Sequence, residues 1–209
     1  MDSAGILVGL LLIYCVQSEA FHSNPFDVIR GCKQYANVVD YNGALEYFAT
    51  DNLQHVGRTP GSKYFRFGIV GPNDGHIRFG GSPYPYGKDV IEIVLSGWAN
   101  TKSVGRRQHR TRPHEKEVNV LLAEVETPKL LSPFRPTMFV LEVFNNGTVQ
   151  VRKDGESHPL LQFRDGNRSL PVDYMAFTKW DKDLIYFYDC PLKETLGGDD
   201  SIFLNCTVV

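Results

Sequence analysis

Alternation of apolar and polar residues runs through most of this 209-residue chain, and it constrains the fold more than any other feature. Successive side chains of a strand point to opposite faces, so a period of two predicts strands with one buried face. Turn sequences such as PND, GGSP, NNG, KDG and RDGN separate these segments. The predicted strands are Tyr64–Val70, Gly75–Phe79, Val90–Leu95, Ser103–Gln108, Val118–Glu126, Thr137–Phe144, Thr148–Lys153, Leu160–Phe163, Tyr174–Thr178, Leu184–Tyr188 and Ser201–Thr207.

The number and spacing of these strands favour an all-β fold, a single-domain antiparallel β-sandwich with few or no helices. Many short strands separated by turn residues are typical of a sandwich, whereas an α/β fold would alternate strands with long helices. Only Gly43–Phe48 allows a short helix. The composition has no biased tract and fits one compact domain.

The N-terminus has the features of a secretory signal peptide. The apolar run Ile6–Val16 is followed by QSEA, with small residues at the positions that precede a cut after Ala20. The run is short for a membrane span, and we expect no membrane span elsewhere. The segment departs from the usual pattern in that it carries Asp2 and no Lys or Arg before the run. A signal anchor is the alternative. We predict a secreted, extracellular protein.

The chain is expected to divide into four parts. Residues 1–20 form the signal peptide, and residues 21–63 form an N-terminal segment that packs on the sandwich or extends it. Residues 64–190 form the main domain, and residues 191–209 form a C-terminal strand and tail.

The charge balance excludes a general attraction to nucleic acid or to a membrane surface. The full chain has 22 basic and 24 acidic residues, and removal of Asp2 and Glu19 with the signal leaves 22 of each. Electrostatic recognition therefore has to come from a local patch.

Three cysteines remain after the signal: Cys32, Cys190 and Cys206. An oxidising compartment favours one bridge among them, and three pairings are open. Cys190 and Cys206 flank a Gly-rich connection and would fall out of register in a hairpin, which favours Cys32 paired with one of the two. Their spacing does not match a zinc site, so no metal is expected.

Three sequons make asparagines candidates for glycosylation: Asn146, Asn167 and Asn205. Asn146 lies in FNNGTV, which has the Asn-Gly signal of a two-residue hairpin turn. Exposed turns suit glycans, so Asn146 and Asn167 are favoured over Asn205, which lies beside Cys206.

No motif for a cofactor or for catalysis is present. The chain has no GxGxxG, GxGxG, GxSxG or HExxH sequence, so no cofactor and no catalytic residue are predicted. His76 lies inside a strand pattern and is expected to be a hydrogen-bonded structural residue. Asp181, Asp183 and Asp189 surround a predicted strand and are interpreted as turn residues.

A basic stretch between two predicted strands is the main local charge excess. Its residues are Lys102, Arg106, Arg107, Arg110, Arg112 and Lys116. Such a stretch is able to bind sulfated or phosphorylated glycans, acidic headgroups or an acidic partner. Residues 107–110 also have the RxxR form that basic-specific proteases cut, and a solvated, mobile connection is the third interpretation.

Trp98 and Trp180 both follow predicted strands. Either ring is able to offer a flat face to a sugar or to an apolar ligand. Large aromatic side chains bury most of their surface, so we favour a structural role that caps the edge of the sandwich.

The ordered segments FRFGIVGPNDGHIRFG, VIEIVLSGWANTKSVGRRQ, FVLEVFNNGTVQVRKDG, PLLQFRDG and VDYMAFTKW together resemble the farnesoic acid O-methyltransferase-like domain of arthropod proteins. The resemblance covers residues 64–190, and Ser96 stands where the family pattern usually has Gly. The positions that match its signature are Asn73, Asp74, His76, Trp98, Asn100, Thr101, Ser103 and Trp180.

The resemblance implies a small β-sheet module without a recognisable S-adenosylmethionine site. We predict a non-enzymatic module that binds an extracellular glycan or protein through loops at one end. An O-methyltransferase that acts on farnesoic acid, towards juvenile hormone precursors, and a passive structural component are the alternatives. The predicted ligand-binding residues are Trp98, Asn100, Lys102, Arg106, Arg107 and Arg110.

Overall fold

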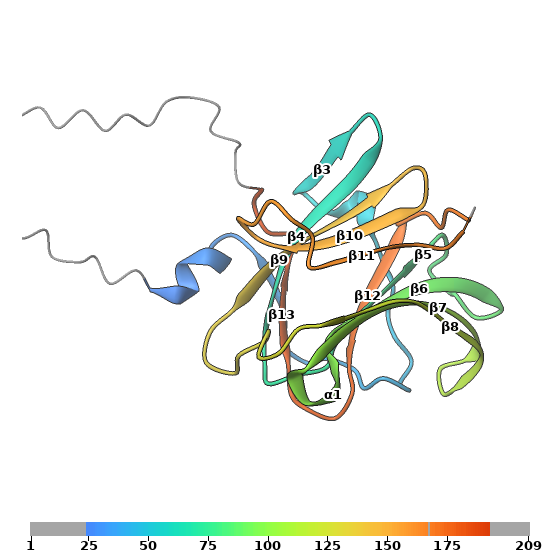
Figure 1. The fold of residues 1–209 in the computed structure, drawn as a ribbon, viewed down its shortest axis with the longest axis horizontal. Coiled ribbons are helices and arrows are strands. Elements are labelled where there is room, and N and C mark those ends of the chain that lie inside the picture. Colours follow the sequence, from blue (N-terminus) through green and yellow to red (C-terminus); the bar gives the residue numbers. More distant parts are fainter. Residues whose placement is uncertain (1–23, 167, 193–209) are drawn as a thin grey trace, which may run out of the picture.

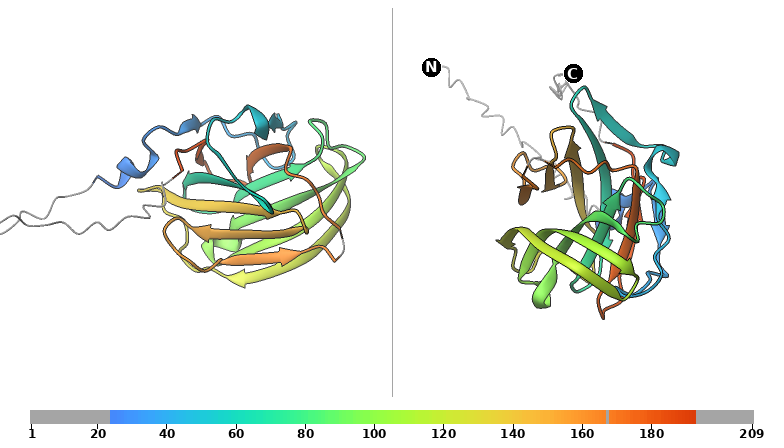
Figure 2. Two further views of the ribbon diagram at one scale, coloured as in Figure 1. Left: turned by 90° about the horizontal axis from the view of Figure 1, so that it is seen from above. Right: turned by 90° about the vertical axis from the view of Figure 1, so that its right-hand side faces the viewer.

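Two antiparallel sheets face each other in the computed structural model, which describes residues 24–166 and 168–192 (Figures 1 and 2). The predicted all-β sandwich is confirmed. The larger sheet has the order β1-β13-β4-β9-β10-β11, with β3 paired to β4. Its strands are β1 (Lys33–Tyr35), β3 (Val56–Thr59), β4 (Ser62–Val70), β9 (Thr137–Phe144), β10 (Thr148–Lys153), β11 (Leu161–Arg164) and β13 (Ile185–Tyr188).

The second sheet has six strands in the order β2-β12-β5-β6-β7-β8. They are β2 (Phe48–Ala49), β12 (Tyr174–Lys179), β5 (Gly75–Gly80), β6 (Lys88–Ser96), β7 (Lys102–Arg112) and β8 (Glu115–Glu126). In Figure 1 the long strands β6, β7 and β8 curve together below β9, β10 and β11. Three short helical segments complete the described chain: η1 (Pro25–Ile29), η2 (Thr50–Asn52) and α1 (Gly97–Asn100).

The core lies between the inner faces of the two sheets. Phe67 and Phe139 stack in the larger sheet, and Ile77, Ile93 and Leu141 are fully buried. Because side chains alternate along each strand, about half of the strand residues point into this core and the others point outward. The inner half is apolar, so the hydrophobic pattern that predicts the strands also determines which face of each strand is buried.

Two glycines permit contacts that a larger residue would block. A Cβ atom at Gly105 of β7 would lie 2.1 Å from the Phe163 ring of β11, so glycine lets the two sheets approach closely at this edge. Gly147 has φ +85° and ends the turn between β9 and β10. The hairpin at Asn146 is present as predicted, but its loop has three residues, Asn145 to Gly147, because Gly147 supplies the left-handed position at its end.

The short helix expected at Gly43–Phe48 is absent. Residues 44–47 form neither a helix nor a strand and lead into β2, and the side chain of Tyr47 is buried. A segment of this length cannot nucleate a helix alone, and pairing of Phe48 with Met175 of β12 favours the strand.

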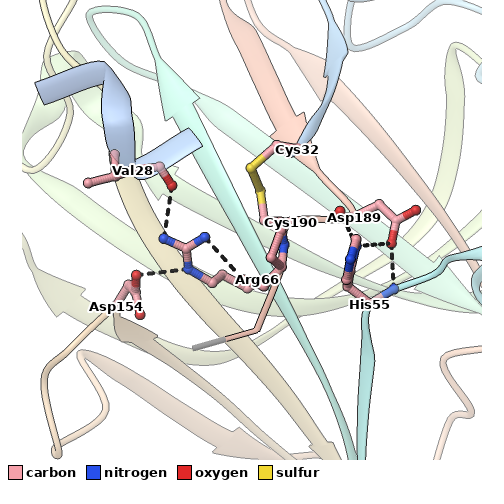
Figure 3. Close-up of a disulfide and its surroundings, with 8 residues drawn as sticks. Val28, Cys32, His55, Arg66, Asp154, Asp189 and Cys190 are labelled. Carbon is pink, nitrogen blue, oxygen red and sulfur yellow. Dashed lines mark hydrogen bonds and ion pairs between the residues drawn. A yellow bond between two sulfur atoms is a disulfide. The ribbon is translucent and has the colours of Figure 1, made fainter. Parts of the chain in front are cut away.

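A disulfide and a buried arginine fasten the N-terminal segment to the end of β13 (Figure 3). Cys32 is bonded to Cys190, 158 residues away, as the preference for a bridge from Cys32 predicts. Arg66 of β4 donates hydrogen bonds to Asp154 Oδ2, to the Val28 carbonyl and to the Pro191 carbonyl. One side chain therefore contacts both ends of the described chain.

Asp189, interpreted from the sequence as a turn residue, is a buried anchor beside this disulfide. Its carboxylate accepts hydrogen bonds from the backbone of Gln54 and His55 and pairs with Lys33 at 2.8 Å. Burial opposes the charge, yet Lys33 and the two backbone N–H groups lower the pKa of Asp189. Asp189 also has φ +51°, consistent with a turn after β13.

Several predicted features lie outside the described residues. They are the signal peptide at residues 1–20, the candidate sites Asn167, Asn205 and Cys206, and the predicted strand Ser201–Thr207. Asn146 lies within the described part and is exposed, as an acceptor asparagine must be. No helix in the described part of the chain is long and apolar enough to cross a membrane.

Candidate functional site

The outer face of the six-stranded sheet has a row of buried charges. Arg78 of β5 pairs across the sheet with Glu92 of β6, which in turn pairs with Arg106 of β7. Inward neighbours such as Ile77 and Ile93 belong to the core, so alternation places these three side chains on the outer face. The segment before β2 crosses this face and brings Tyr41 against it, with the Tyr41 ring 4.4 Å from the Arg78 guanidinium.

Glu92 is the centre of this row and is completely buried. Its carboxylate accepts hydrogen bonds from Arg78 Nε at 2.5 Å, from Arg106 Nε at 2.6 Å and from Gln108 Nε2 at 2.9 Å. Burial alone would raise the pKa of Glu92, but the Arg78 and Arg106 guanidinium groups outweigh it and hold the pKa well below its usual value. Glu92 is therefore a fixed negative charge that its cationic partners already neutralise.

The Tyr41 hydroxyl connects this row to the next strands. It accepts hydrogen bonds from Gln108 Nε2 at 3.0 Å, Arg106 Nη2 at 3.2 Å and Lys116 Nζ at 3.3 Å. The guanidinium of Arg110 lies 4.7 Å from the Tyr41 ring. Tyr41 thus covers part of the charged row and gathers cations from β7 and β8.

A cavity of about 510 Å³ opens on this face, which is within the ordinary size range of small-ligand sites. Trp98 and Trp180 both line it, and each is 53% exposed. The Trp180 ring packs edge-on against Tyr41, with centroids 4.9 Å apart. The residues that line the cavity are Tyr41, Asn42, Asp74, His76, Val94, Trp98, Arg106, Arg110, His114, Lys116 and Trp180.

Trp98 owes its exposure to an unusual turn. In α1, Trp98 (φ 51°, ψ 55°) and Ala99 (φ 57°, ψ 46°) are in the left-handed region, and Ser96 and Asn100 flank them with φ of 60° and 64°. Left-handed conformations cost ~1–2 kcal/mol per L-residue, so a run of them requires compensating contacts.

Asn100 supplies the main contacts that hold this turn. Its Nδ2 donates to the Leu131 carbonyl at 2.9 Å, while its Oδ1 accepts from Leu131 N at 3.1 Å and from Ser96 Oγ at 2.7 Å. Thr101 Oγ1 donates to the Trp98 carbonyl. The turn therefore directs Trp98 outward at the cavity, and Asn100 acts through it as a positioning residue.

His76 forms part of the cavity floor. It is 3% exposed, and neither ring nitrogen has a hydrogen-bond partner among the described residues. Nδ1 lies 3.7 Å from Glu92 Oε1, which is longer than a hydrogen bond. Burial lowers the pKa of His76 despite the nearby Glu92 carboxylate, so the ring is neutral near pH 7. The burial of His76 agrees with a structural histidine, but the hydrogen bond expected of its ring is not formed with any described residue.

The basic stretch does not form a loop, which corrects the sequence-based interpretation. Residues 102–112 form β7, which pairs with β6 on one side and β8 on the other. Arg106 and Arg110 belong to the cavity, whereas Arg107 points to the other face and pairs with Asp89 and Asp165. Residues 107–110 are therefore neither a mobile connection nor a protease-accessible loop, because their backbone is paired within the sheet.

Two other predicted ligand-binding residues lie outside the cavity. Lys102 pairs with Glu124 and Glu126 on the surface of β8, and Asn100 is occupied by the turn. Conversely, the structural role favoured for Trp98 and Trp180 is wrong, because the left-handed turn and the end of β12 expose both rings at the cavity.

The sequence-based prediction missed several residues that build the site. Tyr41, Asn42, Glu92, Val94 and Gln108 carry no recognisable motif. The one available signal is the alternation along β6 and β7, which places Glu92 and Gln108 on the outer face of the sheet, where both polar side chains are buried. In the described part of the chain, no cluster of His, Cys, Asp or Glu side chains is suited to hold a metal ion.

Comparison with known proteins identifies one family model, described as farnesoic acid O-methyl transferase, that matches residues 41–192. A search of curated proteins finds no match. The cavity-lining residues all fall within the matched range.

Among solved structures, the chain is similar to a Bacillus licheniformis β-glucanase, with 10% identity, a TM-score of 0.39, and coverage of 76% of this chain and 95% of that chain. It is also similar to a CBM2 module of the evolved Dit protein of Lactobacillus casei BL23 phage J-1, with 11% identity, a TM-score of 0.33, and coverage of 78% and 91%. At these identities and TM-scores, neither likeness supports an argument about function.

Proposed function

Because the chain belongs to the farnesoic acid O-methyl transferase domain family, we propose that it is a β-sandwich ligand-binding module of that family, non-enzymatic, which takes a glycan in the Trp98–Trp180 cavity. The observation that carries this proposal is the pair of half-exposed tryptophans over a polar floor. Aromatic faces pack on the apolar face of a sugar ring, while buried polar groups bond its hydroxyls. A concave cavity suits such a ligand better than the broad surface of a protein partner.

The family name raises methyl transfer as a second candidate, and the cavity residues do not fit its cofactor. S-adenosylmethionine carries a sulfonium cation, whereas Arg106, Arg110 and Lys116 make the cavity cationic. Asp74 is the single acid that lines the cavity and the three cations outnumber it, while Glu92 lies behind the wall and is already bonded to Arg78 and Arg106. The described helices have at most five residues, so none offers the helix N-terminus that commonly holds a nucleoside cofactor.

We also propose that the protein acts outside the cell. The Cys32–Cys190 disulfide supports this location, because such bonds persist in oxidising compartments. N-terminal sequencing of protein secreted from a eukaryotic host is expected to begin at Phe21, and retention of residues 1–20 on a membrane-bound product would contradict it.

The test of glycan binding is a glycan array probed with the secreted protein, followed by titration of each hit. We expect Trp98→Ala and Trp180→Ala each to weaken binding roughly tenfold, which corresponds to the loss of one aromatic contact of ~1.4 kcal/mol. Phe134→Ala is the matched control, because Phe134 is 83% exposed and does not line the cavity. Loss of binding in the control alone, or indifference of wild type to every glycan, would refute the proposal, and the latter would favour a structural component. Methylation of farnesoic acid by the pure protein would establish the enzymatic alternative.

A further inference from the structure

The cavity has more positive charge than its own acids neutralise. Arg106, Arg110 and Lys116 line it, and Asp74 is the single acidic residue among its lining residues. Glu92 lies behind the cavity wall, with two arginines already bonded to it. A ligand that enters this space therefore meets uncompensated cations.

Arg110 has a buried donor that faces no acceptor. The residue is 2% exposed; its Nε donates to Gln108 Oε1 at 2.9 Å and its Nη1 donates to the Pro113 carbonyl at 2.6 Å. Its Nη2 has no hydrogen-bond partner among the described residues. A buried donor of a charged group without an acceptor is costly, and an anion at this position removes that cost.

Lys116 lies beside Arg110 and is also without an acidic partner. The two residues are paired across β7 and β8, and both lie near the Tyr41 ring, at 4.7 Å for Arg110 and 5.5 Å for Lys116. Within the described chain, Lys116 donates to the Tyr41 hydroxyl and forms no ion pair. Two neighbouring cations thus converge on one side of the cavity.

We propose that the ligand is an acidic sugar whose anionic group, a carboxylate or a sulfate ester, binds to Arg110 and Lys116 while its ring packs against Trp98 and Trp180. This inference rests on the proposed glycan function and specifies the ligand class of the same cavity. The unpaired nitrogens of His76 provide one donor and one acceptor for sugar hydroxyls on the floor. Charge-assisted hydrogen bonds of this kind are about twice as strong as neutral ones.

The test compares three matched probes by isothermal titration calorimetry: a tetragalacturonate, its methyl-esterified neutral form, and a sulfated heparin tetrasaccharide. We expect an acidic probe to bind at least about tenfold more tightly than the neutral ester, because loss of one charge-assisted bond has about that effect. Preference for the uronate identifies the carboxylate as the anionic group. The heparin fragment carries both carboxylates and sulfates, so tighter binding of this fragment than of the uronate indicates the sulfate.

Lys116→Gln is expected to reduce this preference for the acidic probe without abolishing it, because it removes one of the two cations and leaves Arg110 in place. Lys116 is exposed, so its replacement leaves the buried row intact. Lys102→Gln is the matched control, since Lys102 is a surface cation outside the cavity that pairs with Glu124. Arg110→Lys provides a second variant, which keeps the positive charge but loses the paired N–H donors of the guanidinium group. Its folding is checked by circular dichroism. We expect Arg110→Lys to weaken binding of the acidic probe and to leave binding of the neutral ester unchanged.

The possible failures are distinguishable. Equal binding of the ester and the acids would overturn the anionic subsite while leaving glycan recognition intact. Lack of binding to these probes and to every glycan of the array would overturn both proposals. A third outcome is that farnesoic acid binds, that Lys116→Gln abolishes this binding, and that no sugar binds. This outcome would support an anion site at Arg110 and Lys116 but would overturn the proposal that the ligand is an acidic sugar.

Discussion

Replacement of Ala99 by glycine tests whether α1 is left-handed, and we expect it to stabilise the protein. Ala99 is exposed and has φ 57° and ψ 46°, so its methyl group contributes strain and little packing. Glycine adopts this conformation without the steric cost. Most substitutions of alanine by glycine lower stability, so a gain at this position would be diagnostic.

The magnitude follows from two opposing contributions. Relief of one left-handed L-residue is worth ~1–2 kcal/mol, while glycine raises the conformational entropy of the unfolded chain at a cost of ~0.4–1 kcal/mol. We therefore expect Ala99→Gly to raise the free energy of unfolding by about 0.5–1 kcal/mol. For a domain of this size such a change raises Tm by roughly 1–4 °C.

Urea unfolding followed by tryptophan fluorescence measures this change, with calorimetry as a second measurement. Ala44→Gly is the matched control, because Ala44 is also exposed and outside the regular strands, and its φ is not positive. This control is expected to lose about 0.5–1 kcal/mol. If Ala99→Gly loses as much stability as the control, the backbone at Ala99 is not left-handed and the account of Trp98 exposure fails.

Two further predictions concern the buried charges. Glu92→Gln should lower the free energy of unfolding by about 3–5 kcal/mol in urea titrations, because it leaves Arg78 and Arg106 without a counter-charge; Glu124→Gln, at a surface pair, should change it by less than about 1 kcal/mol. For His76, the folded pKa is lowered while the unfolded chain binds a proton near pH 6.5. Stability should therefore fall by up to about 1.4 kcal/mol per pH unit below pH 6.5, and a slope unchanged in His76→Gln would contradict this assignment.

The fold could be predicted from the sequence because one physical pattern determines most of it. Thr137–Phe144 and Thr148–Lys153 alternate strictly and are found as β9 and β10 with the predicted bounds. The prediction failed where alternation gave no guidance. β7 was expected to end at Gln108 and continues to Arg112, because Arg110 and Arg112 pair with β8 through a bulge that the pattern of charges conceals.

Three of the six predicted ligand-binding residues, Trp98, Arg106 and Arg110, line the cavity, and the two arginines were selected for a reason unrelated to the true geometry. Arg106 and Arg110 were selected as part of a solvated basic loop, yet they line the site because they alternate outward along a strand. Tyr41 could not be found, since its position depends on how an irregular segment crosses the sheet. Such a crossing is determined by tertiary contacts, including the Arg78 guanidinium under the Tyr41 ring, and local sequence does not encode it.

Several residues of the family signature form the hydrogen bonds that hold the turn containing Trp98. Asp74 N donates to the Ser96 carbonyl, Asn100 binds Leu131, and Ser103 Oγ accepts from Ser96 N. Ser96 itself has φ 60°, which explains why a family pattern would have glycine there, because glycine alone takes that angle freely. Most signature positions around Trp98 therefore support a strained backbone. Such a turn, held by several hydrogen bonds and leaving a tryptophan half exposed, supports the proposal that Trp98 contacts a ligand, because a structural cap would bury the ring without this strain.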